Sequence, residues 1–158
     1  MHLPALLLAL LLLPGANRTA PQQDERQAVL AALQKLWDGM RTRDTTLLRS
    51  AFVPGARLLG VRTRQTGESV VQNITEQQFA EAVARDTRGA WVERLFDPEV
   101  RIDGTMATVW GAYDFHLGGT FSHCGTDAFQ MLKVSGEWKI ASVSDTFQRE
   151  GCPQRPAP

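Results

Sequence analysis

The chain has 158 residues, of which 43% are hydrophobic and 22% are charged, and its 17 Lys and Arg residues balance its 17 Asp and Glu residues. This length supports one domain with a core of its own, and the composition is ordinary for a globular protein. Because the chain has neither a basic excess nor an acidic tail, its charge excludes a nucleic-acid-binding protein of the usual basic kind.

The sequence opens with an apolar run from Leu3 to Leu13, followed by Pro14–Ala16. This run is too short for a membrane-spanning helix, which needs about 20 residues. It matches the apolar segment of an export signal, which has about 7–15 residues. We therefore expect residues 1–20 to be a signal peptide, and the protein to be secreted or periplasmic with no membrane span after cleavage. A buried N-terminal helix is the alternative.

Three helices are predicted in the first part of the domain. The first covers Asp24–Met40, where apolar residues recur at helical spacing; they are Val29, Leu33, Leu36, Trp37 and Met40. A short second helix follows Asp44, a typical N-cap residue. The third opens with Thr75 and Gln78, which match a capping box, and runs to about Asp86.

Strand patterns fill the rest of the domain, and the last three form a meander. The expected strands are Arg57–Thr66, Val70–Ile74, Trp91–Phe96, Val100–Ile102, Met106–Leu117, Phe121–Val134 and Trp138–Phe147. Turn signals at 103–104, 118–119 and 135–136 join the later strands. Helices gathered on one side of an antiparallel sheet give an α+β fold. We expect one domain over residues 21–152, a curved cone of five to six strands with three helices on its concave side, and a disordered tail at 153–158.

The chain contains two cysteines, Cys124 and Cys152. In an exported protein such a pair indicates a disulfide. Counting back from the turn at 135–136 places Phe147 opposite Cys124, so a tail that folds over the sheet edge would bring Cys152 within reach. No Cys/His spacing typical of zinc is present, and we expect neither a metal nor a cofactor.

Alternation along the strands predicts which side chains face the interior. The two-glycine turn at 118–119 pairs Tyr113 and Phe115 with a strand on which His123, Asp127 and Phe129 share one face. We assign this face to a pocket whose expected lining is Trp37, Tyr113, Phe115, Asp127, Phe129 and Met131. A slip of one residue would exchange the two faces.

Asp127 is the candidate acid/base group, because a carboxyl group on an apolar face has a raised pKa. Tyr113 and His123 are candidates to orient a substrate. Plainer roles stay open: Asp127 bonds the backbone or Ser144, and His123 packs beside the disulfide. Asp114 and His116 are expected on a solvated outer stripe or at a dimer contact. Three arginines either clamp an anionic ligand or protect an edge strand; they are Arg57, Arg62 and Arg64.

The stretches Ala107–His116, Ser122–Gln130, Glu137–Thr146 and Glu150–Cys152 resemble an exported bacterial branch of the nuclear transport factor 2-like superfamily. This superfamily includes SnoaL-like polyketide cyclases and ketosteroid isomerases. The resemblance implies a cone-shaped α+β domain and a homodimer formed through the outer sheet face. It does not imply one activity, because the fold serves enzymes, binders and scaffolds alike.

Three functions are compatible with these features. The first is an exported domain that binds a small apolar or aromatic ligand in a partly apolar pocket. The second is an acid/base enzyme of the isomerase, cyclase or dehydratase type that uses Asp127. The third is a structural or interaction domain whose cavity is filled by its own side chains. We favour the first.

Overall fold

The computed structural model describes residues 19–158, so the expected signal peptide lies outside the described residues except for its last two positions. The elements in chain order are α1 (Thr19–Thr42), α2 (Thr45–Ser50), β1 (Phe52–Thr63), β2 (Ser69–Thr75), α3 (Glu76–Arg85), β3 (Trp91–Asp103), β4 (Met106–Leu117), β5 (Thr120–Val134) and β6 (Glu137–Asp145).

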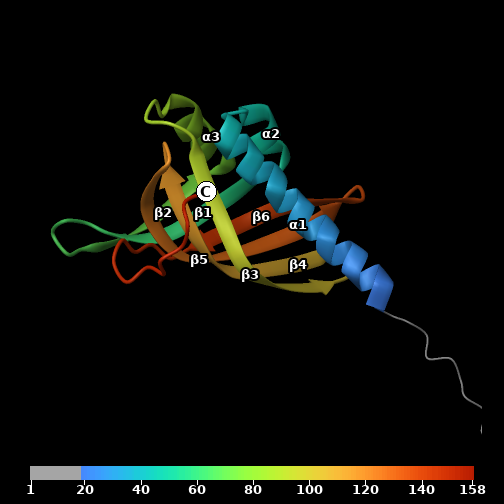
Figure 1. Ribbon diagram of the computed structural model, residues 1–158. Helices are drawn as coiled ribbons and strands as arrows, with labels where there is room; N and C mark the ends of the chain where they lie inside the picture. Colours follow the sequence, from blue (N-terminus) through green and yellow to red (C-terminus); the bar gives the residue numbers. More distant parts are fainter. Residues whose placement is uncertain (1–18) are drawn as a thin grey trace, which may run out of the picture.

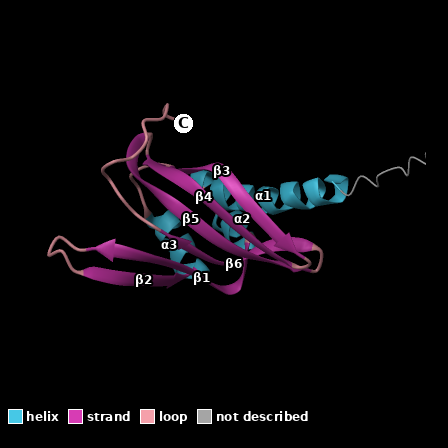
Figure 2. Cartoon of the chain, turned by 90° about the horizontal axis from the view of Figure 1, so that it is seen from below, coloured by secondary structure: helices cyan, strands magenta, loops and turns pink. Residues whose placement is uncertain are grey.

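The six strands form one curved sheet in the order β2-β1-β6-β5-β4-β3. The β1–β6 pair is parallel, and every other neighbouring pair is antiparallel. Helix α1 runs along one face of the sheet and packs against β3 and β6, while α2 and α3 gather at one end of the same face (Figures 1 and 2). The predicted α+β cone with three helices on its concave side is confirmed.

The predicted local signals form as expected at the two shorter helices. The Asp44 side chain accepts hydrogen bonds from the backbone N–H groups of Thr46 and Leu47 at the start of α2. At α3, Thr75 and Gln78 form the reciprocal capping box. Both motifs satisfy N–H groups that a helix N-terminus otherwise leaves without partners.

Strand β3 is longer than the sequence predicted. The expected interruption at Asp97-Pro98 is wrong, because one strand runs through from Trp91 to Asp103. The extra residues form a bulge between Phe96 and Glu99, where Asp97 takes a positive φ of 47°. A bulge lets a strand absorb a proline, which has no N–H to donate, and then resume its pairing.

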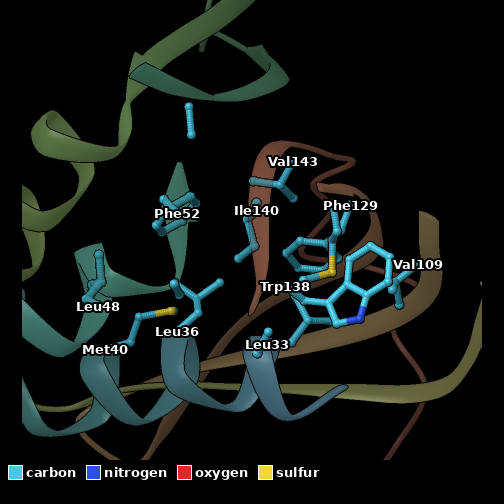
Figure 3. Close-up of a cluster of buried hydrophobic side chains, with 14 of the residues drawn as sticks. Leu33, Leu36, Met40, Leu48, Phe52, Val109, Phe129, Trp138, Ile140 and Val143 are labelled. Carbon is cyan, nitrogen blue, oxygen red and sulfur yellow. The ribbon is translucent and has the colours of Figure 1, made fainter. Parts of the chain in front are cut away.

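The core lies between α1 and the concave face of the sheet. Leu33, Leu36 and Met40 project from α1 toward side chains of the central strands (Figure 3). Those facing residues are Val109, Phe129, Met131, Trp138, Ile140 and Val143. At the N-terminal end of α1, the Glu25 carboxylate accepts hydrogen bonds from the Lys133 ammonium and the Trp138 indole. These contacts hold α1 across the sheet.

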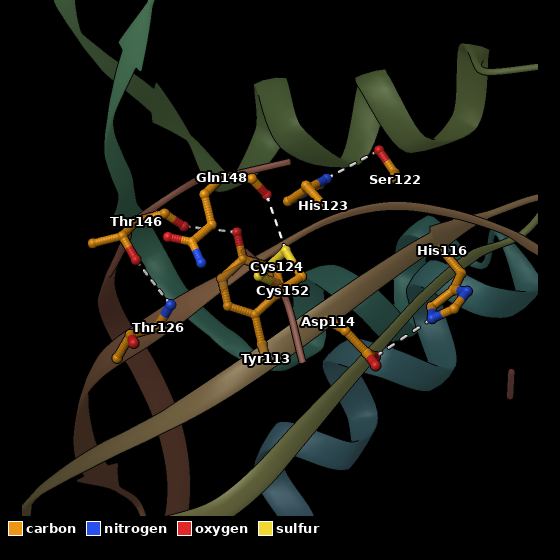
Figure 4. The surroundings of a disulfide bond; sticks show 10 residues. All are labelled: Tyr113, Asp114, His116, Ser122, His123, Cys124, Thr126, Thr146, Gln148 and Cys152. Carbon is orange, nitrogen blue, oxygen red and sulfur yellow. Dashed lines mark hydrogen bonds and ion pairs between the residues drawn. A yellow bond between two sulfur atoms is a disulfide. The ribbon is translucent and has the colours of Figure 1, made fainter. Parts of the chain in front are cut away.

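A disulfide joins Cys124 of β5 to Cys152 of the C-terminal segment, as predicted (Figure 4). The backbone of Gln148, not that of Phe147, pairs with Cys124. The chain then crosses the convex face, where the Pro156 carbonyl accepts a hydrogen bond from Arg94. Arg155 and Pro156 therefore contact β3, within the tail that we expected to be disordered.

Asp114 and His116 are not on a solvated stripe, because each is only 4% exposed. Two guanidinium N–H groups of Arg94 bind both oxygens of Asp114, at 2.9 and 2.6 Å. The C-terminal segment covers this cluster. The expectation of a solvated stripe was wrong because it left out the segment that the disulfide brings across the convex face.

Removing the disulfide should lower the free energy of unfolding by about 3–4 kcal/mol, which is the chain-entropy value for a loop of this size. The measurement is urea unfolding of oxidised wild type and of the Cys124→Ala/Cys152→Ala variant. Reduced wild type serves as the control and should unfold near the variant. Equal midpoints for the oxidised wild type and the variant would contradict this account.

Candidate functional site

A cavity of about 380 Å³ lies between the helices and the concave face of the sheet. Most of its wall is aromatic or aliphatic, with contributions from α1, α3, β3, β4 and β5. These side chains include Leu36, Met40, Phe79, Trp91, Phe115 and Phe129. The ring of Trp91 meets those of Phe79 and Phe115 edge to face, with centroids 5.9 and 5.5 Å apart. The cavity therefore has flat apolar walls that suit a flat molecule.

Asp127 of β5 lines this cavity and is only 3% exposed. Its Oδ2 has no hydrogen-bond partner among the described residues. Burial raises the pKa of this carboxyl group well above its ordinary value, and the neighbouring acids Glu93 and Asp145 raise it further. The protonated form of Asp127 is therefore favoured, and in that form the carboxyl group both donates and accepts hydrogen bonds.

Asp145 of β6 lies directly opposite Asp127 on the neighbouring strand, where the sequence had placed Ser144. The difference comes from a bulge at Gln130–Met131, which shifts the pairing of β5 with β6 by one residue. Ser144 is thereby turned to the exposed face, so the anticipated bond from Asp127 to Ser144 does not form. The shift instead brings two carboxyl groups together on the cavity side.

Asp145 is compensated by a cation, unlike Asp127. A guanidinium N–H of Arg62 donates to its Oδ2 at 2.6 Å. Gly60 lies beneath this pair and leaves room for it. A Cβ at that position would collide with the Asp145 carboxylate and the Arg62 guanidinium. Of the three arginines considered from the sequence, only Arg62 lines the cavity. Arg57 and Arg64 bond Asn73 and Glu68 on the hairpin.

Tyr113 of β4 closes the inner end of the site. Its hydroxyl donates to the Thr146 carbonyl at 2.8 Å and lies 3.3 Å from Asp145 Oδ2. Gly125 makes this possible, because a Cβ there would collide with the Thr146 carbonyl and the Tyr113 ring. Burial and the charge of Asp145 raise the pKa of Tyr113, so its proton stays on the hydroxyl group.

Glu93 of β3 is the third acid in the cavity, and the sequence had not singled it out. The Trp37 indole donates to its Oε1 at 3.0 Å. Burial, followed by the charges of Asp145 and Asp114, raises the pKa of Glu93 to about 7. Glu93 therefore changes protonation near neutral pH.

His123 lies between two aromatic rings and is held there. Its ring stacks on Phe147 at 4.2 Å and on Phe115 at 4.8 Å. Burial lowers its pKa to about 4, and the charges of Arg62 and Arg149 contribute. The imidazole is therefore neutral at pH 7 and has little freedom to turn toward a substrate.

The remaining expected pocket residues divide into two groups. Tyr113, Phe115, Asp127 and Phe129 line the cavity together with His123. Met131 and Trp37 do not line it, which corrects our sequence-based prediction. Met131 is fully buried in the core. Trp37 lies behind Glu93, and Trp37 and Glu93 line a separate cavity of about 320 Å³. Among residues 19–158, no cluster of three or more His, Cys, Asp or Glu side chains is arranged to hold a metal ion.

Residues 24–148 match the profile of a protein family described as "Putative lumazine-binding". The chain belongs to this family. No curated protein matches the sequence. The lumazine-binding-like chain also has the fold of nuclear transport factor 2-like proteins, which confirms the resemblance noted from the sequence.

Solved structures support this fold assignment. An NTF2-like protein of unknown function from Shewanella baltica shares 23% identity at a TM-score of 0.63, over 85% of this chain and 100% of that one. A "putative scytalone dehydratase" from Novosphingobium aromaticivorans shares 14% identity at a TM-score of 0.68, over 88% and 95% of the two chains. An NTF2-like protein from Cytophaga hutchinsonii shares 17% identity at a TM-score of 0.62, over 78% and 98%. At these identities the similarity shows the fold alone.

Replacing Glu93 with Gln should stabilise this family member at neutral and alkaline pH. The folded protein keeps a proton on Glu93 up to pH 7, whereas the unfolded chain releases it near the ordinary value of 4.5. The unfolded state then binds fewer protons, so wild type loses stability as pH rises through this interval. The unfolding free energy of Glu93→Gln relative to wild type should be up to about 3 kcal/mol greater above pH 7 than at acid pH.

The measurement is the unfolding free energy of both proteins across this pH range. The comparison uses the difference between them, because His123 acts in the opposite sense and is common to both. Its depressed pKa makes wild type more stable as pH rises from about 4 toward 6.5. A difference that stays constant with pH would show that Glu93 titrates normally.

Proposed function

We propose that this lumazine-binding-like protein is an exported domain that binds a small, flat, partly apolar molecule in the cavity beneath α1 and α3. The observation that carries the proposal is the Asp127 carboxyl group, which is buried in an aromatic wall with one oxygen that finds no partner in the described part of the chain. An unpartnered buried polar group costs about 1–3 kcal/mol. A ligand that completes its hydrogen bonds would offset that cost.

The chemistry of Asp127 favours a ligand with hydrogen-bonding groups on a flat ring system. A protonated carboxyl group donates through one oxygen and accepts through the other. Heteroaromatic rings that carry N–H and C=O groups side by side offer the matching pair. The pteridine in the family's description has this chemistry, so pteridines are the first compounds to test. The apolar walls from Trp91 and Phe115 would cover the faces of such a ring.

The proposal places the protein in a secretory or periplasmic compartment. The Cys124–Cys152 disulfide supports an oxidising environment, because such bonds are rare where thiols are kept reduced. No helix among the described residues is long and apolar enough to cross a membrane. We also propose a homodimer, for which Met106, Trp110 and Leu132 offer exposed apolar surface on the convex face.

An acid/base enzyme is the second candidate, and the raised pKa of Asp127 favours it. Such an enzyme also needs groups that orient the substrate. Tyr113 already donates its only proton to Thr146, and His123 is fixed between Phe115 and Phe147. Because these candidate partners are engaged, binding accounts for the geometry more economically than catalysis does.

Ligand binding is tested by thermal shift with flat aromatic and heteroaromatic compounds, lumazine included. A bound compound should raise the melting temperature progressively with its concentration. Asp127→Asn should lower the affinity for such a compound by about tenfold, the loss expected for one hydrogen bond to a buried group. Asp24→Asn, at an exposed position on α1, is the matched control and should bind like wild type. A self-filled cavity predicts no shift with any compound.

The enzyme candidate makes a separate prediction about the same substitution. If Asp127 transfers the proton, Asp127→Asn should abolish turnover of any substrate that wild type converts, while the circular dichroism spectrum stays unchanged. Full turnover in the folded variant would remove Asp127 from the mechanism. Binding without turnover in wild type would leave the first proposal standing alone.

A further inference from the structure

The acids in the cavity outnumber the cations that compensate them. Glu93, Asp127 and Asp145 all line the cavity, and they come from three different strands. Arg62 pairs with Asp145 alone. The Trp37 indole donates one neutral hydrogen bond to Glu93, and Asp127 Oδ2 has no partner among residues 19–158. Within residues 19–158, Glu93 and Asp127 thus form no ion pair, although the charge of Arg62 also acts on Asp127.

The other charged groups around the cavity do not supply the missing cation. Arg88 is bound by the Asp86 carboxylate, through three hydrogen bonds from its guanidinium group, and its side chain is 71% exposed. Arg149 is exposed, and its guanidinium carbon lies 5.4 Å from the centroid of the Phe147 ring. His123 is neutral at pH 7. On the convex face Arg94 is bound to Asp114. Apart from Arg62, these cations are therefore exposed or bound to other acids, and the cavity keeps more acidic groups than paired cations.

We propose that the cavity selects aromatic cations, with a planar amidinium or an ammonium group directed at Glu93 and Asp127 and the ring against the aromatic wall. The inference rests on the proposed binding function and names the class of ligand. A cation would compensate both acids in a site of low dielectric, where a charge pair is worth more than in water. An amidinium also offers N–H donors in the planar fork that matches a carboxylate. Trp91 and Phe115 supply ring faces and edges for the aromatic body.

Binding of a cation to these acids is linked to protons. Without a bound cation, burial and the charges of neighbouring acids disfavour the charged forms of Glu93 and Asp127. A cation favours the carboxylates, so the protons leave to solvent as it binds. Affinity should therefore rise with pH, most steeply near pH 7 where Glu93 titrates. A ligand that only accepts hydrogen bonds should show the opposite trend.

Three probes of nearly the same shape test the proposal: benzamidine, benzamide and benzoate, which are cationic, neutral and anionic. Calorimetry or ligand-observed NMR measures each against wild type at pH 8 and pH 5. Benzamidine should bind about tenfold more tightly than benzamide at pH 8, with this advantage shrinking at pH 5. Calorimetry in buffers of different ionisation enthalpy should show proton release with benzamidine only.

Substitutions assign the effect to the two acids. Glu93→Gln and Asp127→Asn keep the shape of each side chain, and each should reduce the benzamidine advantage and its pH dependence. Asp24→Asn should change neither. Benzamide or benzoate binding as tightly as benzamidine, an unchanged preference in both variants, or no binding by any probe would overturn the cation proposal. If pteridines still stabilise the protein in that case, the proposed binding function survives; if no compound does, both fail.

Discussion

The pairing of β4 with β5 is the constraint on which the site depends. It sets Tyr113 against Gly125 and Gly111 against Asp127 across the two strands. Because Gly125 has no side chain, the Tyr113 ring lies close over the backbone and its hydroxyl reaches the Thr146 carbonyl. This contact anchors the inner end of the cavity. It also fixes Asp127 on the concave face, beneath the helices and away from solvent.

The sequence predicted that Tyr113 and Asp127 share a face, although a register shift between Phe115 and His116 separates their pairing from that of the two-glycine turn. The pairing of β5 with β6 was missed by one residue, since nothing in the sequence marks Ala141 of β6 as the extra residue opposite Gln130 and Met131. That single shift decides whether a serine or an acid faces Asp127. Alternation along a strand is therefore a sound guide only as far as the next bulge.

Glu93 was not predicted, and Arg62 could not be separated from Arg57 and Arg64, for a different reason. Each lies on a strand whose neighbour is set by the whole sheet: β1 joins β6 in parallel, and β3 closes the far edge. The broken strand expected at Asp97-Pro98 left Glu93 without an assigned face. The cover over Asp114 depends on the path of the tail after Cys152, which alternation does not describe. Local patterns thus predicted the helices and the meander. Predicting that several acids line the cavity would have required knowledge of the sheet topology.

Buried acids are paired with a cation on one face of the sheet but not on the other, and this difference supports the proposed binding function. On the convex face Asp114 is bound by two N–H groups of Arg94, as expected for an acid with a structural role. On the concave face Asp127 is as deeply buried, yet one oxygen has no partner among the described residues. Burying this group destabilises the folded protein, and no contact among the described residues compensates for that cost. Under the proposed binding function, a bound molecule would supply the missing partner.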